Sequence, residues 1–237
     1  MPSSGFAEYI PHKVFDFPEG TVLIKTFAYL NEHPESNLDK QLLETRLLIK
    51  RDEKWVNVSY VWNKEQNDAF LSIAGKTITT QFVNNEGDIQ DVRYRVPNIN
   101  QCKECHQSGK SIKPIGPKAR NLDKDYAYDD GVMNQLMKWH EQGWIEEDIK
   151  VRAMTDWSIK TMSLNSRARS YLDINCGHCH IEGGSADTTG LYLDFNEDRK
   201  IHLGVYKKPI AAGRASNNLS YSIVPGDPES SIVARVL

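Results

Sequence analysis

Hydrophobic and polar residues alternate along much of the first 96 residues. Val56, Val58 and Tyr60 are separated by single residues, and this period of two is typical of a strand with one buried face. Similar short runs, rich in β-branched and aromatic residues, are joined by polar or glycine-containing links that suit hairpin loops. The predicted strands are 21–29, 42–50, 55–62, 70–73, 76–82 and 89–96. Strands at this spacing predict a small β-sandwich or barrel over residues 1–96, with its charged residues on a solvated face.

The period lengthens towards that of a helix after Pro97. A short helical turn is expected over 98–102, and a helix over 132–142, where Val132 and Leu136 share one face. A further amphipathic helix is predicted to begin at Ser163 and to lead directly into Cys176.

The last third of the chain mixes short apolar runs with turn-forming residues. Segments 191–195 and 201–206 predict a β-hairpin. Asp227 and Pro228 are typical of the N-cap and first position of a closing helix. We therefore expect an α+β fold, with a β-rich domain at 1–96 followed by two small, mainly helical modules at 97–160 and 161–237, the second with a β-hairpin insertion.

Two C-x-x-C-H motifs contain all four cysteines of the chain. This spacing is the attachment signature of c-type haem. Cysteines three residues apart on a helical turn place both sulfurs on one side, where each can form a thioether with a haem vinyl group, and the next histidine can bind the iron. The sequence predicts two covalent haems, attached through Cys102 and Cys105 and through Cys176 and Cys179. The proximal iron ligands are then His106 and His180.

Zinc is the main alternative cofactor, since C-x-x-C pairs also bind zinc when two pairs meet in space. The histidine that follows each pair favours haem, because a four-cysteine zinc site does not need it. A thiol redox pair explains the repeated histidine less well still.

Composition and charge are those of an ordinary globular protein. The chain has 237 residues, a net charge of -3 and 39% hydrophobic residues. It has no basic excess that would predict nucleic-acid binding and no apolar run of the ~20 residues that a transmembrane helix needs. Because c-type haem is attached outside the cytoplasm, we expect a periplasmic or otherwise exported protein. The sequence as given has no signal peptide, so we expect it to be shortened.

The distal iron ligands are less well defined. All five methionines precede Cys176, so none follows the second motif. That haem is expected to have lost its distal methionine with the C-terminus, to use a histidine instead, or to be five-coordinate. The distal candidates for the two haems are His202, His140, Met133, Met137, Met154 and Met162.

The chain resembles a di-haem c-type cytochrome family of exported bacterial proteins, truncated here at both ends. The segments that carry the resemblance are FDFPEGTVLIK (15–25), ETRL (44–47), YVWN (60–63), both C-x-x-C-H motifs, RARSYLD (167–173) and VPGDP (224–228). The resemblance implies that both helical modules are cytochrome c-like. Residues 114–122 also resemble the loop of small class I cytochromes c in which a proline carbonyl accepts a hydrogen bond from the proximal histidine. By this resemblance Pro117 is the partner of His106; the alternative is an ordinary Gly-Pro turn.

The function expected from these features is single-electron transfer between redox partner proteins, such as a dehydrogenase and another cytochrome. A di-haem peroxidase-like enzyme with one open haem is an alternative, although no distal catalytic motif is recognisable, and a zinc-stapled binding module is another. Electron transfer is favoured over enzymatic activity. Arg167 and Arg169 are interpreted as solvated, or as partners of haem propionates.

Overall fold

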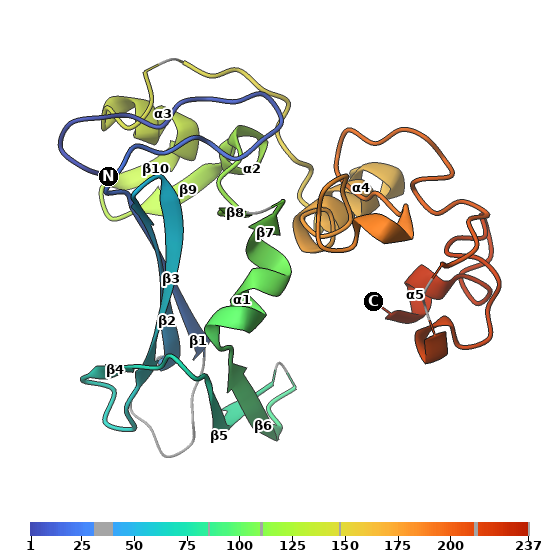
Figure 1. Cartoon of the computed structure of the whole chain (residues 1–237), viewed down its shortest axis with the longest axis horizontal. Helices are drawn as coiled ribbons and strands as arrows, with labels where there is room; N and C mark the ends of the chain where they lie inside the picture. Colours follow the sequence, from blue (N-terminus) through green and yellow to red (C-terminus); the bar gives the residue numbers. More distant parts are fainter. Residues whose placement is uncertain (31–39, 85, 110, 147, 211–212, 237) are drawn as a thin grey trace. The chain divides into compact units, whose positions relative to one another are not determined.

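Two compact units that interleave along the sequence make up the protein. The computed structural model describes residues 1–30, 40–84, 86–109, 111–146, 148–210 and 213–236 (Figure 1). The first unit comprises Met1–Ala7, Asp16–Glu104 and Ser111–Pro114. The second unit comprises Glu8–Phe15, Cys105–Lys110 and Ile115–Leu237. Each unit is therefore made of three separate stretches of the chain. The ranges 1–96, 97–160 and 161–237 predicted from the sequence are instead consecutive.

The first unit is built on an antiparallel meander. Its four strands are β1 (Val22–Leu30), β2 (Lys40–Arg51), β3 (Lys54–Trp62) and β4 (Ala69–Leu71), paired in that order. A separate antiparallel hairpin follows, formed by β5 (Lys76–Val83) and β6 (Ile89–Val96). All six strands lie where the alternating pattern predicts them, to within a few residues. The hairpin links are short and polar, as at Asp52 and Glu53, which both adopt positive φ angles.

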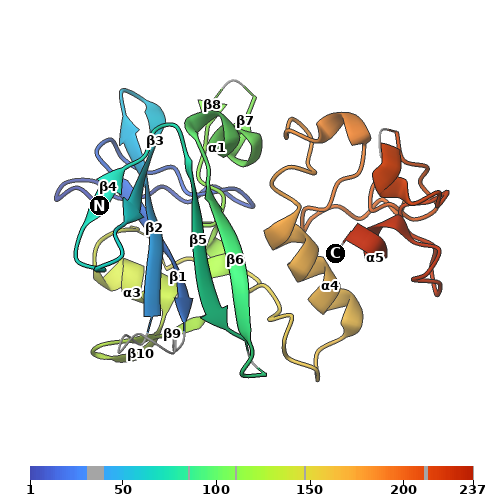
Figure 2. The same cartoon turned by 90° about the horizontal axis from the view of Figure 1, so that it is seen from below.

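The β5–β6 hairpin packs on β1 and β2 (Figure 2). Tyr29 and Phe82 stack with ring centroids 4.6 Å apart, and Phe27 lies 6.4 Å from Tyr94. Glu44 is fully buried beneath this contact. The Tyr94 hydroxyl donates to Glu44 Oε2 at 2.8 Å, while Arg46 donates to both carboxylate oxygens at 2.7 and 2.9 Å. The predicted solvated charged face is therefore wrong at Glu44, because this hairpin covers it.

Helices are short in both units. The chain passes from the first unit to the second inside its first helix, between Glu104 and Cys105. The remaining elements are α1 (Ile99–His106), β7 (Gln107–Ser108), β8 (Ser111–Ile112), α2 (Ala119–Leu122), β9 (Asp125–Tyr128), β10 (Gly131–Asn134), α3 (Gln135–Glu141), α4 (Leu164–Asn175), the 3-10 turns η1 (Asp187–Thr189) and η2 (Gly213–Ser216), and α5 (Ile232–Val236).

The expected α+β fold with two small, mainly helical cytochrome c-like modules is wrong. Among the described residues strands predominate, and the longest helix, α4, has 12 residues. Beyond α4, the described residues form turns, single bridges such as Val205 with Ile223 and the five-residue helix α5, not the longer helices that such a module needs. None of the helices in the described ranges combines the length and apolarity required to cross a membrane.

The helix predicted over 132–142 begins later than expected. Gly131–Asn134 is a strand, β10, that pairs with β9. Asp129 and Asp130 form the hairpin turn between β9 and β10. Aspartate followed by glycine is typical of such turns. Helix α3 then starts where the Asn134 side chain accepts hydrogen bonds from the backbone N–H groups of Leu136 and Met137.

The predicted β-hairpin insertion is wrong too. Segments 191–195 and 201–206 contain no strands, although the Tyr192 N–H donates to the His202 carbonyl at 2.8 Å. Gly204 interrupts the second segment, because its φ angle of 97° is not that of an extended strand. Residues other than glycine rarely adopt such an angle. The closing helix also begins later than expected: Asp227 Oδ1 accepts from the Ser230 N–H at 3.1 Å and caps only a turn.

Candidate cysteine and histidine site

The second C-x-x-C-H motif continues directly from helix α4. Ser163 caps that helix by accepting a hydrogen bond from the Ser166 N–H at 3.1 Å, so the predicted helix start is confirmed. After Asn175 the motif forms a further turn, in which the N–H groups of Cys179 and His180 donate to the Cys176 carbonyl at 3.1 and 2.9 Å. These bonds span three and four residues, which is the helical-turn geometry that places both thiols on one side.

Two glycines allow this turn to lie close to neighbouring backbone. A Cβ atom at Gly177 would approach the Asp173 carbonyl oxygen to 2.8 Å and the Asp194 Cα to 3.2 Å. A Cβ at Gly184 would collide with the Cys179 carbonyl oxygen. The backbone around the motif is therefore tightly packed, which fixes the positions of its side chains.

His180 is half-buried and has backbone support on one side of its ring. Its Nδ1 lies 3.3 Å from the Leu191 carbonyl oxygen and 3.4 Å from Thr189 Oγ1. Burial lowers the pKa of His180, which favours the neutral imidazole. A proton on Nδ1, donated to the Leu191 carbonyl, leaves the Nε2 lone pair available for a metal. This is the kind of support that the resemblance to class I cytochromes c implies for His106 from Pro117. No local signal pointed to Leu191, which lies 11 residues from His180.

The first motif lies on helix α1. Asn98 and Gln101 form a capping box: Asn98 Oδ1 accepts from the Gln101 N–H, and Gln101 Oε1 accepts from the Asn98 N–H, both at 3.0 Å. Cys102 and Cys105 therefore lie one helical turn apart, with His106 as the last residue of the helix. This arrangement also meets the requirement for thioether attachment.

The second unit brings residues of both motifs together. Ligand atoms of Cys105, His178 and Cys179 all lie within 4.8 Å of one another. His178 Nδ1 is buried and has no hydrogen-bond partner among the described residues. Burial lowers the pKa of His178, and the nearby His106 and Lys118 add to this effect. Two thiols and a neutral imidazole are typical ligands of a soft metal ion. Nothing in the C-x-x-C-H spacing marks His178 as a ligand.

The cysteine thiols have different surroundings. None of the four, all of which lie in the described ranges, forms a disulfide. Cys105 is exposed, whereas the other three are partly buried. Burial raises the pKa of Cys176, and the neighbouring Cys179 raises it further. In the first unit, Cys102 lines a cavity of about 260 Å³ together with Ile73, Pro97 and Ile99.

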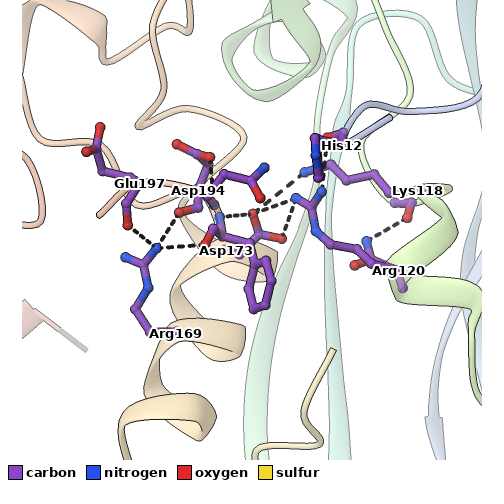
Figure 3. A network of polar contacts seen from close by, with 11 residues as sticks. His12, Lys118, Arg120, Arg169, Asp173, Asp194 and Glu197 are labelled. Carbon is purple, nitrogen blue, oxygen red and sulfur yellow. Dashed lines mark hydrogen bonds and ion pairs between the residues drawn. The ribbon is translucent and has the colours of Figure 1, made fainter. Parts of the chain in front are cut away.

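A buried ion pair anchors helix α4 one turn before the second motif (Figure 3). Arg120 Nη2 donates to both carboxylate oxygens of Asp173 at 2.8 and 3.1 Å. Asp173 Oδ1 also accepts from the Phe195 N–H at 2.8 Å, and Lys118 Nζ lies 3.9 Å away. Arg120 Nη1 donates to the His12 carbonyl at 3.0 Å. No local sequence pattern connects residues this far apart.

Arg169 holds the loop that follows the motif. Its Nη2 donates to the carbonyl oxygens of Asp194, Phe195 and Glu197 at 2.7, 3.0 and 2.6 Å (Figure 3). The interpretation of Arg169 as a solvated residue therefore does not hold. Together with the Asp173 bonds, these contacts keep the 194–197 loop against helix α4.

The other predicted ligands lie in varied surroundings. The Pro117 carbonyl accepts a hydrogen bond from the Phe15 N–H at 3.1 Å. The His202 ring packs edge-on against Tyr192, and its Nδ1 lies 3.3 Å from a Glu197 carboxylate oxygen. His140 Nδ1 lies 3.4 Å from the Ile145 carbonyl oxygen. The methionine candidates are Met133 in β10, Met137 in α3, and Met154 and Met162 in the segment before α4. Their roles as distal ligands stay predictions.

Comparisons of the chain with protein-family models, with curated proteins and with solved structures find no match. The site must therefore be interpreted from its own residues. Its donor set fits a covalent haem at each motif: paired thiols on a helical turn, followed by a histidine whose Nδ1, in the case of His180, faces a backbone carbonyl.

Proposed function

We propose that this protein is an exported di-haem c-type electron-transfer protein. The observation that carries the proposal is the pair of C-x-x-C-H motifs, each on a helix or helical turn and together using every cysteine of the chain. The Nδ1 contact of His180 with the Leu191 carbonyl adds support, because it orients the ring for ligation through Nε2.

The cysteines and the final histidine of each motif have defined roles in this proposal. Cys102 and Cys105 hold one haem and Cys176 and Cys179 the other, and the iron of a bound haem supplies one-electron redox chemistry. His106 and His180 bind the two irons on the proximal side. The Leu191 carbonyl keeps the proton of His180 on Nδ1. The close packing at Gly177 and Gly184 keeps the thiols and the imidazole in fixed relative positions.

The partners and the location follow from the cofactor. An electron carrier needs a donor and an acceptor, and we propose other redox proteins, such as a dehydrogenase and a second cytochrome, in these roles. Because haem c is attached outside the cytoplasm, we propose that the protein acts in the periplasm or an equivalent exported compartment.

A haem count after export through a c-type maturation host tests this proposal. The pyridine haemochrome spectrum should give two covalent haems per chain. The Cys176→Ala/Cys179→Ala variant should keep one haem, and so should Cys102→Ala/Cys105→Ala. His178→Gln is the matched control, since it changes the second motif without removing a thioether or the proximal ligand, and it should keep both. A chain without covalent haem after such export would overturn the proposal.

A zinc-binding module is the second candidate function. The cluster of Cys105, His178 and Cys179 favours it, because three ligand atoms within 4.8 Å suit a tetrahedral metal ion. Haem and zinc would compete, since both use the Cys105 and Cys179 sulfurs.

Single cysteine variants distinguish the two candidates. In haem-free protein, Cys105→Ser should weaken zinc binding at least about tenfold if this cluster is the site, because a thiolate ligand is lost. Cys102→Ser, on the same helix but outside the cluster, should leave the zinc affinity within about twofold. Equal effects of the two variants on zinc affinity would exclude the cluster as a zinc site. In protein exported through the maturation host, equal losses of haem from the first motif in the two variants would instead support thioether attachment.

A further inference from the structure

A basic cavity lies in the second unit, and none of its lining residues belongs to either C-x-x-C-H motif. Its volume is about 220 Å³. Apolar and aromatic side chains, among them Tyr9, Val151 and Phe195, form part of its wall. Five cationic side chains also line it: Lys13, Lys118, Arg120, Lys150 and Arg152. No carboxylate is among its lining residues in the described part of the chain.

Two of these cations are buried. The Arg120 side chain is 7% exposed and the Lys118 side chain 12%. Burial lowers the pKa of Lys118, although the nearby Asp173 acts in the opposite direction. Both cations share Asp173 as their carboxylate partner, behind the cavity wall. A second carboxylate, Asp194, is close enough to affect Lys118.

Arg120 has one donor that this network leaves unused. Its Nη1 and Nη2 donate to the His12 carbonyl and to Asp173, but its Nε is buried and has no hydrogen-bond partner among the described residues. A buried, unsatisfied N–H of a charged group is costly, so Arg120 keeps a hydrogen-bonding capacity that its described neighbours do not use.

The remaining cations lie at the rim and are more exposed. Lys150 is 3.7 Å from Asp148, and both side chains are largely exposed, so this pair is weak. The guanidinium groups of Arg152 and Arg120 lie 5.9 and 5.8 Å from the centre of the Phe195 ring. The cavity therefore combines an aromatic wall with more positive charges than there are neighbouring carboxylates to neutralise them.

We propose that this cavity binds a small organic anion with a carboxylate head and a flat apolar body. The carboxylate pairs with the positive charges of Lys118, Arg120 and Arg152, because guanidinium groups and carboxylates form strong charge-assisted hydrogen bonds. The apolar body packs against Phe195 and Val151. This inference does not depend on the proposed electron-transfer function.

Titration calorimetry of the full-length chain with benzoate and, separately, with inorganic phosphate tests the proposal. Benzoate should bind at least about tenfold more tightly than phosphate, since only benzoate has an apolar body to bury. Lys118→Met and Arg152→Gln should each weaken benzoate binding by about fivefold to tenfold. Lys160→Gln, at an exposed lysine outside the cavity, is the charge-matched control and should bind as the unaltered chain does.

Each contrary result overturns a stated part of the proposal. Tighter binding of phosphate would exclude the apolar body and indicate an inorganic oxyanion instead. Benzoate binding that is absent, or unchanged in both cavity variants, would exclude the site. If Lys118→Met fails to fold by circular dichroism, Arg152→Gln decides alone, because Arg152 is an exposed residue at the rim.

Discussion

The guanidinium of Arg120 binds both carboxylate oxygens of Asp173, at 2.8 and 3.1 Å, with the two side chains 7% and 0% exposed. Asp173 lies three residues before Cys176 and also accepts the Phe195 N–H. One carboxylate thus joins helix α4, helix α2 and the 194–197 loop. The position of the second C-x-x-C-H motif depends on this buried contact.

Removing Asp173 should destabilise the second unit strongly. Asp173→Ala is expected to lower the free energy of unfolding by about 3–5 kcal/mol, because it leaves Arg120 buried without its carboxylate. Urea titration followed by tryptophan fluorescence measures the change. Asp198→Ala removes an exposed carboxylate of the same unit and should cost less than about 0.5 kcal/mol. Equal effects of the two variants would contradict the anchoring role of Asp173.

Gly177→Ala should disturb the turn of the second motif. The added Cβ would meet the Asp173 carbonyl oxygen at 2.8 Å, so backbone must shift, at an expected cost of about 1–3 kcal/mol. Thermal unfolding monitored by circular dichroism measures the loss. Gly116→Ala is the matched control, since its Cβ would meet nothing within 4 Å. A Gly177→Ala variant as stable as Gly116→Ala would show that the turn accommodates a Cβ atom at residue 177.

Glu197 should make the second unit sensitive to acid. Hydrogen bonds from Arg199 lower the pKa of this carboxyl from its usual 4.5 to about 2. A lowered folded-state pKa contributes stability above pH 4.5, and this contribution is lost as the pH falls towards 2. The melting temperature should therefore drop over this interval, and less steeply in Glu197→Gln.

Glu146→Gln is the control for the acid experiment, because Glu146 is exposed. Its melting temperature should follow the unaltered chain at every pH. Parallel curves for Glu197→Gln and the unaltered chain would exclude Glu197 as the source of the acid sensitivity.

Tyr94 should ionise only at unusually high pH. Burial, followed by its hydrogen bond to Glu44, raises the pKa of Tyr94 above its ordinary value of 10.0. The folded state therefore holds this proton when the unfolded state loses it, so stability should fall as the pH rises above 10. Tyr94→Phe should remove the latest-ionising tyrosine from an absorbance titration at alkaline pH. Tyr126→Phe, at a tyrosine that is 54% exposed, is the matched control and should leave that last ionisation step in place.

Local patterns predicted the first unit well because its strands follow a local rule. Side chains alternate across a strand, so Val56, Val58 and Tyr60 already indicate its buried face. The burial of Glu44 could not be predicted in this way. It depends on Tyr94, 50 residues further along the chain, and on where the β5–β6 hairpin packs.

The second unit was predicted less well, because its structure depends on long-range polar contacts. Arg120 and Asp173 are 53 residues apart, and neither has a neighbouring motif that marks it. The helix predicted over 132–142 begins only at Gln135, because Asp130 and Gly131 suit a hairpin turn as well as a helix start. The C-x-x-C-H motifs were recognisable from their spacing, but the approach of Cys105 to His178 and Cys179 was not.

The interleaving of the two units has a consequence for how such a protein can be divided or recombined. The chain passes between the units at five points, after residues 7, 15, 104, 110 and 114. Residues 8–15 belong to the second unit, where Val14 bridges to Lys118 and the Phe15 N–H donates to the Pro117 carbonyl. No single cut yields both units whole, and a gene fragment starting at residue 105 would lack this N-terminal piece. Exchanging one unit for a foreign one would therefore require several coordinated splices rather than a single junction.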